Sequence, residues 1–425
     1  MSGPGSRDWR TRQALRTLAG CRNRRGTTVE TRSLRHGREM VAIPGPSVIP
    51  DRVLSAMNRA MPNIYQGELI EMSLSIFEDL PGVARTEGEA FVAVSNGHGG
   101  WQMALSNTLS RGDKVLVLES GVFATSWGRM AETSGLDVQV LPGRHRLPVD
   151  VDAVEAALRE DTAHAIKAIL VVQVDTASSV LNDIAAIRRA IDAAGHPALF
   201  MVDCIASLAC DRYEMDEWGV DITVAGSQKG LMVPPGLGFV WASPKALSAY
   251  EHADLKAGYW DWGPRRAKGA HYLRYCGTPP VQHVWALREA LDMLGEEGLE
   301  NVWWRHEVLA GAVRAAVDAW GDGTGIELVI EDPGARSNAV TTVYTGEVDP
   351  DRLRELAESQ AGLVLGVPLQ GYDGQAFRIG HMGHLNPTMI LGTLGSIEAV
   401  LFGMGVALKR SGVGAAAAVI GPSMA

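Results

Sequence analysis

Ala198-Leu-Phe-Met-Val-Asp203 and Asp221-Ile-Thr-Val-Ala-Gly-Ser-Gln-Lys229 are two stretches in which a short apolar run ends in polar or glycine residues. Val115-Leu-Val-Leu-Glu119 and Ala168-Ile-Leu-Val-Val-Gln-Val174 have the same character. Runs of this length, separated by segments long enough for crossover helices, predict the buried strands of a mostly parallel sheet. We therefore expect an α/β fold in which helices sandwich the sheet.

One crossover helix is clear from its periodicity. Between Asp183 and Ala194, Ile184, Ile187 and Ile191 form one stripe, and the segment ends at Gly195. In such sheets ligands bind beyond the carboxyl ends of the strands. We therefore expect three polar elements to meet in one crevice there, namely Asp175, Asp203 and Gly226 to Lys229.

The pattern changes after about residue 280. Two long helical segments are followed by four short strands, over 326–330, 339–344, 363–367 and 377–379, and by further helices. This alternation predicts a smaller C-terminal α+β domain. We expect a large domain over residues 41–299, a small domain over 300–412 and a tail over 413–425.

Residues 1–40 hold ten arginines, no lysine and three acidic residues, and they lack hydrophobic periodicity. This composition predicts a disordered basic tail. An organellar transit peptide has a similar composition, and an upstream extension before Met40 that contributes nothing to function is a third interpretation.

Composition excludes several classes of protein. The net charge of −10 leaves no basic excess for general nucleic-acid binding. No apolar run approaches the roughly 18 residues that a membrane span needs. Four cysteines without metal-ligand spacing indicate neither a metal site nor a disulfide framework. We expect a cytoplasmic protein that binds no nucleic acid and no membrane.

Lys229 is one of seven lysines in the 425-residue chain, and it follows a buried strand and a glycine turn. A nucleophilic lysine must be neutral part of the time, which requires desolvation or a nearby positive charge. Taken alone, Lys229 is better explained as an ordinary loop lysine. Its convergence with Asp203 on one crevice favours a chemical role.

Six motifs occur in order, and together they are more specific than any one of them. They are Pro44-Gly-Pro-Ser47, Ser95-Asn-Gly-His-Gly-Gly-Trp101, Val202-Asp-Cys-Ile-Ala-Ser207, Gly226-Ser-Gln-Lys229 with Pro234-Pro-Gly236, Thr278-Pro-Pro280 and Phe377-Arg-Ile-Gly380. From residue 41 to about 405 the chain resembles class V aminotransferases. It is most similar to the alanine- and serine-glyoxylate branch of the fold-type I pyridoxal phosphate (PLP) enzymes.

The resemblance implies a role for each residue around the cofactor ring. Lys229 would form the Schiff base with PLP and later move the substrate proton. Asp203 would pair with the ring nitrogen and keep it protonated. Phe123 would stack on the ring, and Thr176 would donate a hydrogen bond to its phenolic oxygen. Without the other motifs, Phe123 would be interpreted as a core residue and Asp203 as a turn former.

The resemblance also implies how the phosphate is held. A dianion needs backbone N–H groups and a helix N-terminus, which Asn96, Gly97 and His98 would supply between a strand and a helix. Gln228 would add a side-chain donor. Tyr275 and Thr278 would reach the same phosphate from a second subunit, which implies a homodimer with shared active sites. A core tyrosine and a turn threonine are the simpler interpretation of that pair.

Arg378 would hold the substrate α-carboxylate with its planar fork, and an interdomain ion pair is its simpler explanation. The implied reaction is a ping-pong transamination that moves the amino group of serine, alanine or aspartate to a 2-oxo acid, most simply glyoxylate. The chain departs from the branch at Pro62-Asn-Ile-Tyr-Gln-Gly-Glu68 and at Ser178-Ser179, which leaves the donor open.

Other functions fit the sequence less well. A pyridoxamine-pyruvate type aminotransferase would not need the phosphate-binding elements. A lyase or cysteine desulfurase would need a loop cysteine, whereas Cys204 follows Asp203 directly and Cys276 lies in the expected dimer contact. A nicotinamide oxidoreductase would need a G-x-G-x-x-G turn after a strand, which is missing. A non-catalytic binding protein would not require Lys229, Asp203 and Arg378 together.

Overall fold

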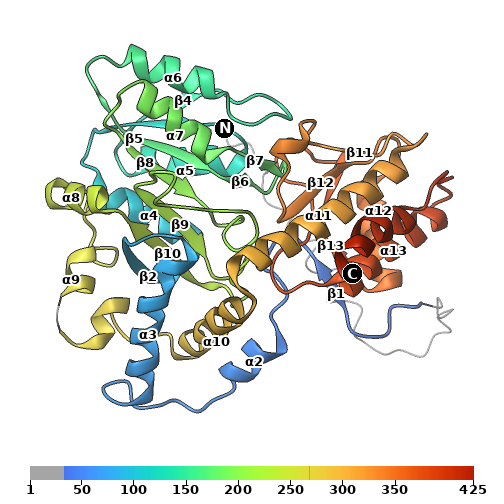
Figure 1. Ribbon diagram of the computed structural model, residues 1–425, viewed down its shortest axis with the longest axis horizontal. Coiled ribbons are helices and arrows are strands. Elements are labelled where there is room, and N and C mark those ends of the chain that lie inside the picture. Colours follow the sequence, from blue (N-terminus) through green and yellow to red (C-terminus); the bar gives the residue numbers. More distant parts are fainter. Residues whose placement is uncertain (1–32, 268) are drawn as a thin grey trace, which may run out of the picture. The chain divides into compact units, whose positions relative to one another are not determined.

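The apolar runs form the central sheet of a computed structural model that describes residues 33–267 and 269–425 (Figure 1). In spatial order, its seven strands are β2 (Glu89–Ser95), β10 (Gly236–Ala242), β9 (Ile222–Gly226), β8 (Leu199–Asp203), β5 (Ile166–Val172), β3 (Lys114–Leu118) and β4 (Asp137–Leu141). Within this sheet β10 runs antiparallel to both of its neighbours, and the other pairs are parallel. The predicted mostly parallel sheet is confirmed.

Helices cover both faces of the sheet because successive strand side chains point to opposite sides. Along β8, Phe200 and Val202 pack on one face of the sheet, whereas Leu199 and Met201 pack on the other, and together the two faces form the core around the sheet. The first face packs against α3 (Glu68–Val83), α6 (Val151–Glu160), α7 (Ile184–Ala193) and α10 (Val281–Glu297). The second face packs against α4 (Gly97–Thr108), α5 (Val122–Thr133), α8 (Pro244–His252) and α9 (Trp262–Arg266).

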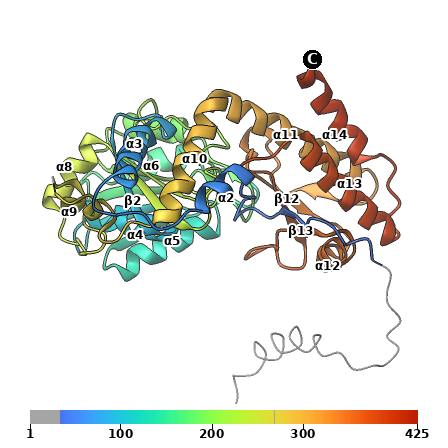
Figure 2. The ribbon, with the colours of Figure 1, turned by 90° about the horizontal axis from the view of Figure 1, so that it is seen from below.

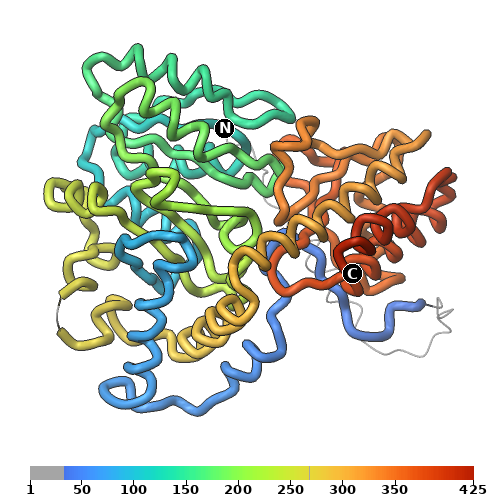
Figure 3. The backbone as a smooth tube through the Cα atoms, in the orientation of Figure 1, coloured from blue at the N-terminus to red at the C-terminus, as the bar shows by residue number. Residues whose placement is uncertain are grey.

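A second hydrophobic core lies among the C-terminal elements (Figure 2). They include an antiparallel sheet of β11 (Glu327–Leu328), β12 (Val340–Tyr344) and β14 (Ala376–Gly380). Its helices are α11 (Leu299–Gly321), α12 (Pro350–Ala361), α13 (Pro387–Gly403) and α14 (Gly412–Ile420). Figure 3 follows the backbone from α10 into α11, and between them Gly298 has φ +81°, which suits glycine.

Two segments differ from their expected places. Met40–Ala42 forms β1, which pairs in parallel with β13 (Leu363–Leu365), so these residues join the C-terminal elements rather than a tail or the large domain. Residues 413–425 were expected to be a tail, yet they form most of α14 and a following 3₁₀ turn. Ala416 and Ile420 are buried in the second core, which explains why this segment folds.

The expected basic tail falls mainly on residues 1–32, which lie outside the described residues. The division into a large and a small domain stays a prediction, and we propose to keep it on the basis of the two cores. The remaining short elements are α2 (Asp51–Met57), β6 (Val174–Asp175), β7 (Val180–Leu181), η1 (His271–Tyr275) and η2 (Pro333–Ala335). Within the described residues, no helix is both long enough and apolar enough to cross a membrane.

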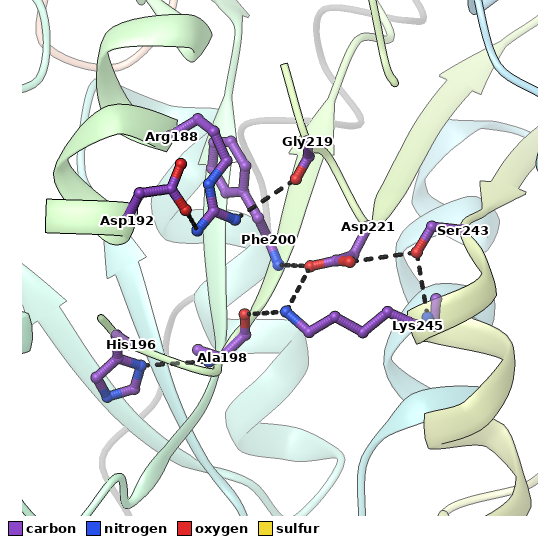
Figure 4. Close-up of polar contacts among 10 residues, drawn as sticks. Arg188, Asp192, His196, Ala198, Phe200, Gly219, Asp221, Ser243 and Lys245 are labelled. Carbon is purple, nitrogen blue, oxygen red and sulfur yellow. Dashed lines mark hydrogen bonds and ion pairs between the residues drawn. The ribbon is translucent and has the colours of Figure 1, made fainter. Parts of the chain in front are cut away.

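A polar network ties together the amino ends of β8 and β9 (Figure 4). The Asp221 carboxylate accepts hydrogen bonds from the Phe200 amide at 2.8 Å, from Lys245 Nζ at 3.0 Å and from the Ser243 hydroxyl at 3.2 Å. Lys245 Nζ also donates to the Ala198 carbonyl at 2.8 Å. Since the Asp221 carboxylate and the Lys245 amine are hydrogen-bonded to each other and to their neighbours, we assign this edge of the sheet a structural role. We therefore expect the functional site at the opposite edge, where the carboxyl ends of the strands lie.

Glu398 carries a testable part of this fold, because it fastens α14 to α13 and α11. Its carboxylate accepts hydrogen bonds from Trp320 Nε1 at 2.9 Å, the Ser411 hydroxyl at 2.8 Å and the Gly412 amide at 2.6 Å. We expect Glu398→Ala to lower the free energy of unfolding by about 2–3 kcal/mol, since it leaves buried donors unpaired. Hydrogen exchange should accelerate first in α14.

The control for Glu398→Ala is Glu358→Ala, which removes an exposed glutamate in α12.

Burial raises the pKa of Glu398, but the hydrogen bonds from Trp320 and Ser411 and from the backbone outweigh it and hold the pKa below its usual range. Its stabilisation is therefore present above the unfolded-state pKa and is lost as the pH falls through the folded-state pKa. Equal exchange of α14 in both variants would refute this role.

Candidate active site

A cavity of about 120 Å³ lies at the carboxyl edge of the sheet. We call it the lysine cavity; it is lined by Gly97, His98, Phe123, Val172, Val174, Thr176, Asp203, Ile205, Ala206, Gln228 and Lys229. These residues follow β2, β3, β5, β8 and β9, whose carboxyl ends meet there as parallel strands require. The lining brings together seven of the site residues predicted from the sequence: Gly97, His98, Phe123, Thr176, Asp203, Gln228 and Lys229.

Lys229 presents a desolvated amine to this cavity. Burial lowers the pKa of Lys229 to about 8, and the positive charge of Arg378 contributes, while Asp203 opposes the shift. Lys229 Nζ donates a hydrogen bond to the Pro44 carbonyl. The amine is therefore neutral for a substantial fraction of the time under mildly alkaline conditions, as a nucleophile requires.

The segment around Gly45 covers the lysine, a contact that the motif Pro44-Gly-Pro-Ser47 does not reveal in the sequence. The Ser47 amide donates to the Gln228 carbonyl at 2.9 Å, and its hydroxyl donates to the Lys229 carbonyl at 2.8 Å. Gly45 has φ +91°, and a Cβ there would lie 2.5 Å from Lys229 Nζ. Only glycine fits this approach, so the Pro-Gly-Pro motif fixes the lysine from outside the sheet.

Asp203 lies at the end of β8 with both carboxylate oxygens held. Oδ1 accepts from the Ile205 amide at 2.6 Å, and Oδ2 accepts from Trp101 Nε1 at 2.8 Å. Burial raises the pKa of Asp203 to about 7 against these hydrogen bonds. A carboxylate held in this way favours a positively charged partner on the cavity side.

The N-terminus of α4 forms another wall of the lysine cavity. Asn96 does not line it but caps the helix, since its side chain accepts from the His98 amide at 3.1 Å. Gln228 Oε1 is buried without a hydrogen-bond partner among the described residues. A Cβ at Gly226 would lie 3.1 Å from that oxygen and 3.5 Å from the Gly97 nitrogen, so the Gln228 amide sits beside the helix terminus.

Phe123 and Thr176 are held in place by Asp175, a residue to which the sequence assigned no separate role. Asp175 accepts from the Phe123 amide at 3.0 Å and from the Ala177 amide at 2.8 Å. A Cβ at Gly121 would lie 2.3 Å from the Asp175 carboxyl carbon. Burial raises the pKa of Asp175 to about 6, and the backbone hydrogen bonds oppose the rise. The signal in the sequence was only an aspartate before Thr176, which many turns share.

Arg378, on β14, does not line the lysine cavity, but it contacts Thr176, which does, and 7% of its surface is exposed. Nε donates to the Val367 carbonyl at 2.7 Å, and Nη1 donates to the Thr176 carbonyl at 2.8 Å. Burial lowers the pKa of Arg378 to about 10, and Asp175 opposes that shift. Two protein contacts fix the guanidinium, and among the described residues Nη2 makes no hydrogen bond, so this edge is available to a carboxylate.

Tyr275 and Thr278 do not reach the lysine cavity of their own chain. Tyr275 is buried, and its hydroxyl shares a hydrogen bond with the Ser73 hydroxyl. Thr278 is exposed. Their contact with the site of a second subunit stays a prediction.

A larger cleft of about 420 Å³ adjoins the lysine cavity. Val122 and Ala177 line this cleft, and their chain neighbours Phe123 and Thr176 line the cavity. The cleft takes residues from both halves of the chain, including Arg129, Ser178 and Tyr372. The two spaces thus share a wall formed by these neighbouring residues.

The residues present fit PLP. A helix N-terminus and the unsatisfied Gln228 amide, whose oxygen and nitrogen are interchangeable by a flip, suit the phosphate. The Asp203 carboxylate suits a protonated ring nitrogen, and the Lys229 amine suits the aldehyde. Among the described residues, no three His, Cys, Asp or Glu side chains cluster in a way that would hold a metal ion.

Comparisons with known proteins agree with this geometry. The family described as "Aminotransferase class-V" matches residues 88–366. The serine–glyoxylate aminotransferase of Methylorubrum extorquens is 42% identical over 91% of this chain and 97% of its own length. The L-aspartate–glyoxylate aminotransferase of Paracoccus denitrificans is 39% identical over 88% of this chain and 94% of its own length.

Solved structures show the same fold. Ureidoglycine-glyoxylate aminotransferase from Bacillus subtilis superposes with a TM-score of 0.83 at 23% identity, over 92% of this chain and 100% of the other. Pyridoxamine-pyruvate aminotransferase from Mesorhizobium loti has a TM-score of 0.82 at 26% identity, over 92% and 100% of the two chains. The predicted fold, a large α/β part with a smaller C-terminal part, is confirmed.

The titration of Lys229 is directly measurable in the protein without added cofactor. We expect Lys229 to react with an amine-labelling reagent with a midpoint near pH 8, about two units below an ordinary lysine. Arg378→Gln should move this midpoint upward, because it removes a positive charge that disfavours the ammonium form. Quantitative mass spectrometry of the labelled peptide reports both values.

The control for this titration is Arg212→Gln, which removes an exposed arginine paired with Glu214 and should leave the Lys229 midpoint unchanged. A midpoint above about pH 10 in the unmodified chain would contradict the desolvated amine, since that is the range of exposed lysines.

Proposed function

Because the chain belongs to the class V aminotransferase family, whose members depend on PLP, we propose that it moves the amino group of a small amino acid to glyoxylate. The observation that carries the proposal is the lysine cavity, where Lys229, Asp203 and the α4 N-terminus face one space. Relatives named for serine–glyoxylate and L-aspartate–glyoxylate transamination support glyoxylate as the acceptor and a small donor.

PLP supplies an electron-withdrawing ring that stabilises negative charge developing at the substrate α carbon. The Lys229 amine holds the cofactor and, when displaced by the amino donor, carries the proton from the α carbon. Its pKa of about 8 suits this work, because a base near the working pH both accepts and returns a proton. Burial raises the pKa of Asp203 to about 7, so a protonated ring nitrogen beside it, together with the hydrogen bonds from Ile205 and Trp101, would keep Asp203 ionised.

The other cavity residues orient the cofactor. Phe123 supplies an aromatic face, and Thr176 offers a hydroxyl to the phenolic oxygen. Gly97, His98 and Gln228 hold the phosphate at the N-terminus of α4, and Asn96 keeps that terminus ordered by capping it.

Arg378 binds the α-carboxylate of donor and acceptor in turn. Since both substrates require the same guanidinium and the same lysine, they bind in alternation, which gives ping-pong kinetics. Side chains of the donor extend toward the larger cleft, where Ser178 and Tyr372 lie, so the cleft selects the donor.

The alternatives are weaker for structural reasons. A pyridoxamine-pyruvate type reaction leaves the Gln228 amide and the helix terminus without a phosphate to hold. A desulfurase needs a mobile, accessible thiol, whereas Cys204 and Cys210 are fully buried. Burial raises the pKa of both thiols, which makes them poor nucleophiles.

We propose a homodimer in which Tyr275 and Thr278 contact the partner's cofactor phosphate. Exposed apolar side chains at Met61, Tyr65 and Tyr259 support a buried subunit contact near this region. A cytoplasmic location is proposed from the free thiols of the described cysteines.

Glycine formation tests the proposed reaction. The full chain, supplied with PLP and glyoxylate, should become yellow and should produce glycine from serine, alanine or aspartate. Lys229→Ala should lower turnover by roughly 10²–10⁴-fold or more, because it removes the general acid–base. Lys167→Ala, which removes an exposed lysine, is the control and should retain activity.

Two outcomes would defeat separate parts of this proposal. No glycine from any donor would exclude glyoxylate as the acceptor, and a colourless protein that PLP does not reconstitute would exclude the cofactor. Chromatographic measurement of glycine and the visible absorption spectrum distinguish them.

Arg378→Lys tests the carboxylate clamp. The ammonium keeps the charge but loses the two-pronged geometry, so kcat/KM for amino acids should fall by about 30–1,000-fold, as for a truncated buried charge contact. The rate with ethanolamine, which has serine's amine and hydroxyl but no carboxylate, should fall far less. Single-turnover absorbance changes measure both; equal losses for serine and ethanolamine would show that Arg378 has a structural role instead.

A further inference from the structure

Trp101 links the two ends of the lysine cavity without lining it. It lies on the first turns of α4, whose N-terminal residues Gly97 and His98 line the cavity. Its indole Nε1 donates to Asp203 Oδ2 at 2.8 Å. One short helix therefore contacts both the anion-binding end and the carboxylate end of the same cavity.

The indole is fixed on every side by packing. Trp101 is completely buried, its ring stacks on Trp127 with centroids 5.8 Å apart and an interplanar angle of 11°, and the His98 ring meets it edge-on at 4.4 Å. A donor held this rigidly imposes one orientation on its acceptor, because the ring cannot turn to follow the carboxylate.

The chemistry of the donor suits a carboxylate that must stay charged. An indole N–H donates and cannot accept, and it carries no titratable proton in the working range. It therefore stabilises the ionised form of Asp203 and leaves its negative charge uncompensated. A lysine or arginine in the same place would neutralise that charge. The charge of Asp203 remains available to a cation inside the cavity.

We propose that Trp101 is a positioning residue that orients Asp203 and keeps it ionised for the ring nitrogen of PLP. This inference rests on the proposed cofactor role of Asp203. It implies that α4 serves the cofactor twice, through its N-terminus at the phosphate and through Trp101 at the ring.

Trp127 provides the matched control, since it belongs to the same stack and is equally buried. Its Nε1 has no hydrogen-bond partner among the described residues. Trp127→Phe thus removes an indole from the stack without touching Asp203, whereas Trp101→Phe removes the side-chain N–H that donates to Asp203 and leaves the Ile205 amide in place. Both variants replace an indole by a phenyl ring, but only Trp101→Phe loses the hydrogen bond to Asp203.

Affinity for PLP is the first measurement, made by equilibrium dialysis on the cofactor-free full chain. Trp101→Phe should weaken PLP binding by about tenfold or more, the value of a hydrogen bond to a charged group, and Trp127→Phe by far less. Thermal melting of both cofactor-free variants checks that they are folded. Equal weakening by the two substitutions would overturn the inference, since ring packing alone would explain it.

The pH dependence of PLP affinity is a second measurement, and a change in ring packing alone would not alter it. Loss of the donor raises the Asp203 pKa, so the deficit of Trp101→Phe relative to the unmodified chain should grow as the pH falls and shrink as it rises. The charged and titratable groups facing Asp203 are Lys229, Asp175, Cys204 and, on the far side of Trp101, His98. All four are the same in both tryptophan variants, so the difference between the variants isolates Asp203.

A double-mutant cycle with Asp203→Asn separates this inference from the function on which it rests. If Trp101 acts through the Asp203 charge, Trp101→Phe should change PLP affinity by less than about threefold in the Asp203→Asn background. A persistent tenfold effect would overturn the inference. Unchanged PLP affinity of Asp203→Asn alone would instead overturn the cofactor role of Asp203.

Discussion

Desolvation at the carboxyl ends of β8 and β9 is the constraint on which the rest of the site depends. Asp203 and Lys229 are both buried there, and burial raises one pKa to about 7 and lowers the other to about 8. In water the two groups would titrate more than six units apart. Burial thus makes the charge of both groups depend on their neighbours: a cation beside Asp203 favours its ionised form, and the neutral form of the Lys229 amine becomes accessible near neutral pH.

Desolvated groups of this kind hold their positions only when neighbours satisfy them. Asp203 accepts hydrogen bonds from Trp101 and from the Ile205 amide. The Lys229 amine donates to the Pro44 carbonyl, and Asp175 accepts from the Phe123 amide. These partners come from segments far apart in the chain. A rigid surrounding shell explains why a small cavity with few polar groups suffices to bind a cofactor.

The sequence predicted the central sheet, the covering helices and the cavity lining, because apolar runs and strand-end residues are local signals. It missed contacts that depend on pairing across long separations, such as β1 with β13 and Trp101 with Asp203. The predicted tail over residues 413–425 differs from the structure because the alanine-rich sequence of α14 carries only a weak helical pattern. Its burial depends on Glu398 and α11, which no local signal reveals.

Chemistry and selectivity are separated in this architecture. The residues that fit the cofactor follow sheet strands, whereas the adjoining cleft combines loops of the large part with Ile330 and Gln370 to Tyr372 of the C-terminal part. Loops tolerate substitution that strand ends do not, because fewer packed neighbours constrain them. We therefore propose that the shape and charge of the cleft around Arg129, Ser178 and Tyr372 select the donor, while the lysine cavity carries the same chemistry for each.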